Sequence, residues 1–89
     1  KFVSDFKSAY YMRLTVEDKP GFLAKIATVF GKHNISIVEL MQKPAREDGK
    51  APLVIVTHET HEMSVRAAVA KINSLEGVAH VDTVLRVVS

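Results

Sequence analysis

Apolar and polar side chains alternate along residues 10–17, and this period of two predicts a β-strand with one buried face. Residues 18–21 read Asp-Lys-Pro-Gly, which indicates a turn because proline cannot donate to a sheet ladder. From Phe22 to Phe30 apolar residues recur at three- and four-residue spacing, so we expect an amphipathic helix. We place its end at His33-Asn34, since asparagine tolerates the left-handed backbone conformation found after many helices.

The rest of the chain predicts one more helix and three more strands. Apolar residues at helical spacing between Val65 and Leu75 indicate the helix, with Thr60 as its N-cap and Gly77 just past its end. A charged, glycine-containing hairpin is expected at residues 44–50. The predicted strands are residues 35–43, 52–59 and 78–88.

This order of elements, β-α-β-β-α-β, predicts a ferredoxin-like α+β fold. Right-handed crossovers would give a four-stranded antiparallel sheet with both helices on one face. A chain of 89 residues has room for one such domain, which we assign to residues 10–89. Residues 1–9 are expected to be a linker or docking arm, and the start at Lys1 points to a piece of a longer protein whose catalytic part lies elsewhere.

Composition excludes several classes of chemistry and nominates no partner. The 47% of hydrophobic residues fits a globular chain, and the absence of cysteine excludes disulfides, thiolate metal sites and thiol catalysis. A formal net charge of +2, with both signs interspersed, gives no electrostatic reason to expect nucleic acid. Apolar runs are far shorter than the roughly 20 residues that cross a bilayer, so we expect no membrane span and a cytoplasmic protein.

The junction between the first strand and the first helix is the strongest candidate for a binding site. The Pro-Gly turn aims the first free N–H groups of the helix at one region, and such a terminus attracts carboxylates. Asp18 beside those donors has the opposite sign, so a zwitterion such as an amino acid would find a complementary pair. The alternative is that Asp18 merely caps the helix, and spacing alone favours that reading.

Histidines offer a weaker alternative. His58 and His61 lie three residues apart and a glutamate follows each, but the spacing that puts two imidazoles on one helical face is absent. We therefore predict solvent-exposed histidines and no metal site. His33 and His80 have no carboxylate partner in the sequence pattern, so no catalytic triad or acid–base pair is expected.

Three groups of residues carry a resemblance to a known family. They are the turn Asp18-Lys19-Pro20-Gly21-Phe22-Leu23, the helix positions Lys25, Ile26 and Phe30, and the segment Asn34-Ile35-Ser36-Ile37. With these motifs the chain resembles the ACT domains, regulatory domains that sense amino acids. The segments Tyr10-Tyr11-Met12-Arg13-Leu14, Val54-Ile55-Val56-Thr57-His58-Glu59 and Val84-Leu85-Arg86-Val87 narrow the resemblance to the C-terminal ACT domain of the homoserine dehydrogenases.

The resemblance implies homodimers that join their sheets side by side, with an effector at the interface. Asp18 matches the turn residue that contacts the effector, and Asn34 matches a residue that reaches the ligand of the neighbouring subunit. From the residues alone, Asn34 reads equally well as the C′ position of the helix. The implied effector-binding set is Asp18, Gly21, Phe22, Leu23, Asn34 and Ile35.

The resemblance also implies a role in metabolism. It indicates feedback control by threonine, or a related amino acid, of an NAD(P)-dependent parent enzyme, while this fragment carries no cofactor and no catalytic residue. Two other readings stay open. One is a dimerisation module without ligand; the other, disfavoured because residues 52–59 contain no Phe or Tyr on which bases could stack, is an RNA-binding module of the same element order.

Overall fold

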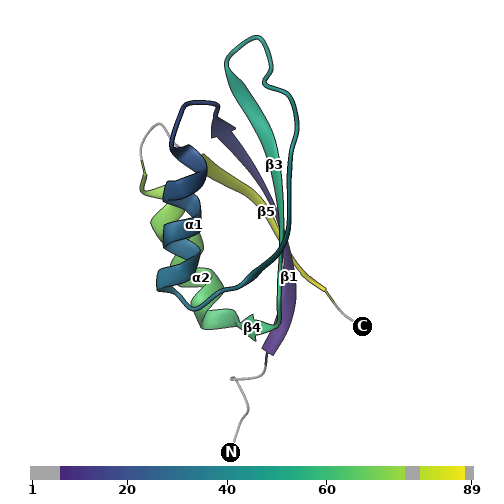
Figure 1. Ribbon diagram of the computed structural model, residues 1–89. Helices are drawn as coiled ribbons and strands as arrows, with labels where there is room; N and C mark the ends of the chain where they lie inside the picture. Colours follow the sequence, from purple (N-terminus) through teal and green to yellow (C-terminus); the bar gives the residue numbers. More distant parts are fainter. Residues whose placement is uncertain (1–6, 76–78, 88–89) are drawn as a thin grey trace, which may run out of the picture.

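The computed structural model describes residues 7–75 and 79–87, which form a two-layer α/β sandwich. Two helices lie side by side on one face of the sheet, and the opposite face is uncovered (Figure 1). In chain order the elements are β1 (Lys7–Glu17), α1 (Phe22–Lys32), β2 (Ile37–Gln42), β3 (Lys50–Thr57), β4 (Thr60–His61), α2 (Glu62–Asn73) and β5 (Ala79–Val87).

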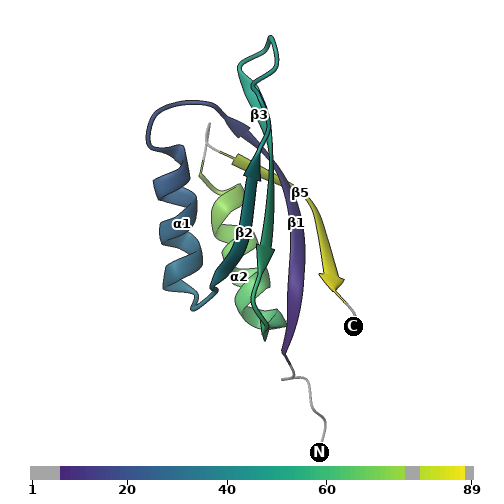
Figure 2. The same cartoon turned by 45° about the vertical axis from the view of Figure 1, so that its right-hand side comes forward.

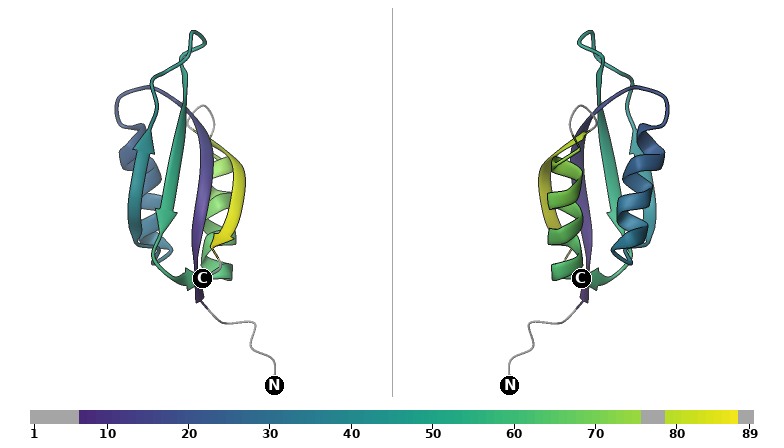
Figure 3. Two further views of the ribbon diagram at one scale, coloured as in Figure 1. Left: turned by 90° about the vertical axis from the view of Figure 1, so that its right-hand side faces the viewer. Right: turned by 90° about the vertical axis from the view of Figure 1, so that its left-hand side faces the viewer.

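The sheet is antiparallel, with β1 and β3 in its interior. The order across the sheet is β2-β3-β1-β5, and the short β4, which follows β3 in the chain, pairs with Lys7 and Ser8 at the start of β1. Helix α1 covers the β2 side, whereas α2 covers the β5 side (Figures 2 and 3). This arrangement confirms the predicted ferredoxin-like fold and leaves β2 as an exposed edge strand.

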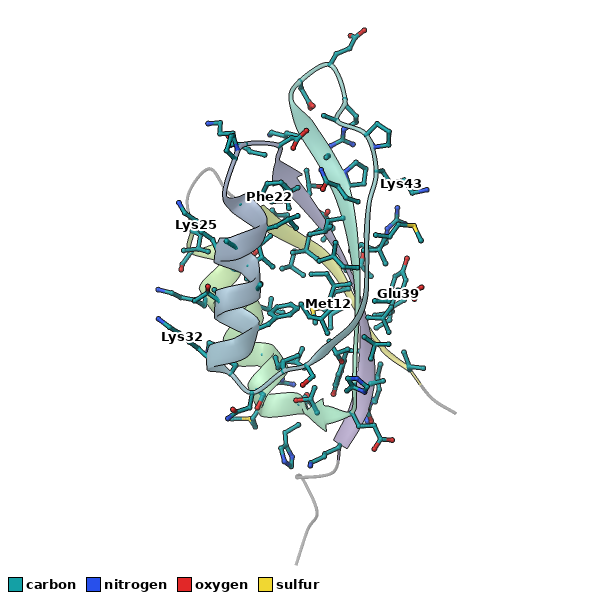
Figure 4. All side chains as sticks on the ribbon, in the orientation of Figure 1. Met12, Phe22, Lys25, Lys32, Glu39 and Lys43 are labelled. Atoms are coloured by element: carbon teal, nitrogen blue, oxygen red, sulfur yellow. The ribbon has the colours of Figure 1, made fainter. Side chains whose placement is uncertain are left out.

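The core lies between the sheet and the helices. Met12 points toward the helices in Figure 4 and is fully buried, as are Ile55 on β3 and Ile72 on α2. Burying side chains of this size contributes about 1.5–3 kcal/mol each. One polar group shares this layer: the Thr57 hydroxyl accepts the Tyr10 N–H at 3.0 Å and donates to the His58 carbonyl at 2.8 Å, so its burial leaves no unmet hydrogen bond.

Strand β1 begins three residues earlier than predicted, at Lys7 instead of Tyr10. Lys7 and Ser8 pair with β4, a fifth strand that the sequence did not indicate. Two residues are too few to display a period of two, which explains why β4 escaped prediction. Residues 7–9 of the predicted arm therefore lie inside the sheet.

Other boundaries also differ. Strand β2 begins at Ile37 instead of residue 35, and β3 spans Lys50–Thr57 instead of 52–59. The bond from the His58 N–H to the Ser36 carbonyl, at 2.9 Å, continues the β2–β3 ladder just past the Ile37–Thr57 pair. The prediction that Thr60 caps α2 is wrong: Thr60 is buried in β4, and the N-cap is His61. Gly77 and the two outermost residues of the predicted fourth strand, 78 and 88, lie outside the described residues. Within the part of the chain described, no helix is long and apolar enough to cross a membrane.

Candidate functional site

The turn between β1 and α1 has one defined backbone geometry. The Phe22 N–H donates to the Lys19 carbonyl at 3.3 Å, and Gly21 has φ +88° and ψ −6°. With Pro20 before it, this is a type II β-turn, whose third position requires a positive φ. A Cβ on Gly21 would meet nothing within 4 Å, so the backbone angle and not lack of space selects glycine.

Helix α1 starts with open donors. Its N-cap, Gly21, provides no side-chain hydrogen bond, and the first bond of the helix runs from the Lys25 N–H to the Gly21 carbonyl at 3.2 Å. The N–H groups of Leu23 and Ala24 have no acceptor among the described residues. The Phe22 side chain is buried and its N–H belongs to the turn, so Phe22 holds the turn in place while its neighbours face outward.

Asp18 is exposed, and its carboxylate has no hydrogen-bond or ion-pair partner in the described part of the chain. It is not the N-cap of α1, so the capping role that spacing favoured is wrong. The proline-glycine turn occupies the capping position instead. The Asp18 backbone is fixed, since its N–H donates to the carbonyl of Gly49 at 3.1 Å.

Asn34 ends helix α1 in a Schellman motif. Its φ is +59°, its N–H donates to the Gly31 carbonyl at 3.1 Å, and the Ile35 N–H donates to the Phe30 carbonyl at 2.9 Å. This confirms the C′ reading. The Asn34 side chain is exposed and has no partner among residues 7–75 and 79–87, whereas the Ile35 side chain is buried in the core.

The predicted residues fall into two groups at opposite ends of α1. Asp18 and Gly21 precede this 11-residue helix and Asn34 follows it, so the length of the helix, about 16 Å at 1.5 Å per residue, lies between the two groups. One chain therefore does not bring Asp18 and Asn34 together. Only a second copy could place an Asn34 side chain beside the turn.

The histidines are not gathered into a metal-binding cluster in the described residues. No group of three or more potential ligands gathers there. His58 is exposed as predicted, but His61 is partly buried, contrary to expectation. His80 does have a carboxylate nearby, which the sequence pattern did not reveal: its Nε2 lies 3.8 Å from Asp82 Oδ1, while Asp82 Oδ2 accepts the Thr15 hydroxyl at 2.7 Å.

A groove of about 380 Å³ that sequence reasoning missed runs between α1 and α2 on the side away from the sheet. Lys25, Lys32 and Lys71 flank it, and the first two extend outward from α1 in Figure 4. It contains none of the six predicted site residues. Its only sequence signal is the i, i+7 spacing of Lys25 and Lys32, which is also typical of the solvated face of any amphipathic helix.

Comparisons with known proteins agree on one family and one fold. The model of the ACT domain family matches residues 10–77. A homoserine dehydrogenase of Pseudomonas aeruginosa is 43% identical over 74 residues, which are 82% of this chain and 17% of that protein. The chain spans about a fifth of the length of the curated relatives it matches.

Solved structures give the same result. The crystal structure of a homoserine dehydrogenase from Thiobacillus denitrificans superimposes with a TM-score of 0.74 and 37% identity over 91% of this chain and 17% of that one. The ACT domain from GTP pyrophosphokinase of Chlorobium tepidum superimposes with a TM-score of 0.65 over 91% of this chain and 99% of that one. At 21% identity, the second likeness concerns the fold alone.

Proposed function

Because this chain belongs to the ACT domain family, whose members sense amino acids, we propose that it binds an amino acid where two copies of the chain meet. The observation that supports the proposal is that the turn leading into α1 holds both an unpaired Asp18 carboxylate and, at the start of the helix, the open N–H groups of Leu23 and Ala24. An amino acid presents an ammonium to the first and a carboxylate to the second. Both contacts are charge-assisted hydrogen bonds, which are about twice as strong as neutral ones.

The second copy completes this site through the edge of β2. If β2 pairs antiparallel with β2 of the partner about a two-fold axis, the two α1 helices, which cover the β2 side of each sheet, also run antiparallel. The end of one α1 then lies near the start of the other. In this arrangement Asn34 of one subunit reaches the ligand that Asp18 of the other subunit holds.

The relatives narrow the proposal to an enzyme class. They are homoserine dehydrogenases, so we take the parent of this domain to be a cytoplasmic, NAD(P)-dependent enzyme of that kind, with threonine or a related amino acid as effector. Control follows if the effector has different affinities for two arrangements of the dimer, because a ligand shifts an equilibrium only by its differential affinity.

Two other readings explain less of the turn. A ligand-free dimerisation module needs the β2 edge but gives no reason for an unpaired carboxylate and open N–H groups in the same turn. An RNA-binding module stacks two or three bases on aromatic side chains of the open sheet face. Here β3 contributes Val54 and Val56, and Tyr11 of β1 is the single Phe or Tyr on that face among the described residues.

Calorimetric titration of the 89-residue chain tests the proposal, with threonine first and the other standard amino acids separately. Asp18→Asn keeps the size of the side chain and removes its charge, so we expect at least tenfold weaker binding of the effector. Glu47→Gln, an exposed change at the hairpin of residues 43–49, is the matched control and should bind as the wild type does. A folded dimer that gives no heat with any amino acid would refute the proposal, as would an Asp18→Asn variant with wild-type affinity.

A further inference from the structure

The sheet has a second apolar face, which no helix covers. It is the face turned toward the viewer on the left of Figure 3, and side chains from all four long strands contribute to it. Met41, Leu85 and Val87 are 49%, 54% and 46% exposed there. We call it the open face; its apolar members are Tyr11, Met41, Val54, Val56, Leu85 and Val87.

Strand register makes these residues one continuous patch. Tyr11 lies opposite Val56 on β3 and opposite Leu85 on β5, which gives a row of three large side chains across the sheet. Met41 and Val54 are paired in the next row. Side chains paired in this way lie about 5 Å apart, so they are in contact and not scattered. Contiguous apolar patches of this kind mark interaction surfaces.

The open face also carries both signs of charge. Arg13 lies opposite Val54 and Glu39 opposite Val56, so both side chains project from this face; Glu39 points away from the helices in Figure 4. Neither has an ion pair among the described residues. In a two-fold interface residue i meets j and residue j meets i, so one Arg13–Glu39 contact would form twice. A surface for a strongly acidic or basic partner would instead have one sign.

The area of the open face indicates how many copies of the chain a stable interface on it would need. About seven paired residues on each of β1, β3 and β5, and five on β2, cover about 410 Å² at about 3.3 Å per residue and 4.8 Å per strand. A stable interface buries about 800 Å² per partner. One open face is therefore too small, but two faces joined edge to edge reach about 820 Å².

We propose that the open face of one edge-joined pair packs against the open face of a second pair, so that the domain assembles as a dimer of dimers. The inference rests on the edge pairing of the proposed function. Tyr, Arg and Met, which are enriched in the cores of protein–protein interfaces, would lie at its centre. The combined face is large enough for a stable interface only after the β2 edges have joined, so face packing depends on edge pairing.

Sedimentation of the wild-type chain over a range of concentrations, with variants of each surface, tests this. The wild type should reach the mass of four copies. Val56→Lys on the open face should reduce it to two copies with unchanged effector affinity, and Leu85→Lys provides the same test if that variant fails to fold. Met63→Lys, at an exposed position on α2, is the control and should leave four copies.

A change at the β2 edge separates the two interfaces. Val38 is skipped in the register between β2 and β3, so Val38→Pro should spare that ladder and yet block addition of another strand. We expect single copies, confirmed as folded by circular dichroism, with Val38→Lys as the alternative. A wild type that stays at two copies, or a Val56→Lys variant that keeps four, overturns this inference and leaves the proposed function intact. A wild type of single copies overturns both.

Discussion

Replacing Asn34 with glycine separates the two roles that this residue combines. Asn34 holds a φ of +59° after α1, and its side-chain amide is the group proposed to reach the partner's ligand. Glycine adopts a positive φ without the strain of a Cβ, so Asn34→Gly keeps the Schellman motif and removes only the amide. Alanine at the same position also removes the amide but keeps the strained Cβ, and it tolerates the left-handed region less well than asparagine does.

The expected free energies follow from this geometry. Asparagine is several-fold enriched over most residues with a Cβ in the left-handed region, which corresponds to about 1 kcal/mol, so Asn34→Ala should lower the unfolding free energy by about that amount and the melting temperature by about 4–8 °C. Asn34→Gly should stay within about 1 kcal/mol of the wild type, because relief of strain offsets the greater freedom of the unfolded glycine chain. Both variants lose a hydrogen bond to a charged ligand group, worth about 1.5–3 kcal/mol, or about 10- to 150-fold in affinity.

Urea denaturation and calorimetric titration of the same three proteins measure the two effects independently. Equal loss of affinity in both variants, with loss of stability only in Asn34→Ala, would support a ligand contact. If Asn34→Gly binds the effector as tightly as the wild type does, Asn34 serves only to end the helix, and the intersubunit half of the site is wrong.

Two further predictions concern stability alone and are measured by urea denaturation. Thr57→Val leaves the Tyr10 N–H without its buried acceptor and should lower the unfolding free energy by about 1–3 kcal/mol. The control, Thr28→Val on the exposed face of α1, should change it by less than about 0.5 kcal/mol. Equal effects of the two changes would refute the role of the buried hydroxyl. Gly21→Ala should destabilise the protein by about 1–2 kcal/mol, because residue 21 has a φ of +88°. Gly31→Ala, inside α1, should stabilise it by about 0.5–1 kcal/mol. Effects of the same sign would contradict the assignment of the turn.

The long periodic segments were predictable from the sequence. Short strands, and strand ends set by contacts with other segments, were not. The alternation in β1 and the stripe of α1 each reflect one buried face, so periodicity located them. Ile35 looks like a strand residue in the sequence, but its N–H donates to the carbonyl of Phe30 at the end of α1. Strand β2 therefore starts later than the apolar pattern predicts. Strand β4 exists because Lys7 and Ser8 lie beside it, and such a pairing between distant segments leaves no local pattern.

The candidate site divides in the same way. Asp18 and the turn were found because Pro20 and Gly21 have strong local preferences, and the capping alternative failed because the type II turn moves the start of the helix past the reach of residue 18. The distance between Asp18 and Asn34 is a property of the folded helix. Whether a second chain bridges it depends on association, which no pattern within one sequence encodes.

The bond from the Asp18 N–H to the Gly49 carbonyl connects the β1–α1 turn to the β2–β3 hairpin. The loop beyond it is held by the bond from the Gly49 N–H to the Arg46 carbonyl and by an Arg46–Asp48 ion pair. If an effector displaces the turn, we expect the protruding tip of the hairpin to move with it (Figure 1). A fluorophore attached in place of Glu47 would then report effector binding as a change in fluorescence, and the domain would serve as a sensor of the effector's concentration.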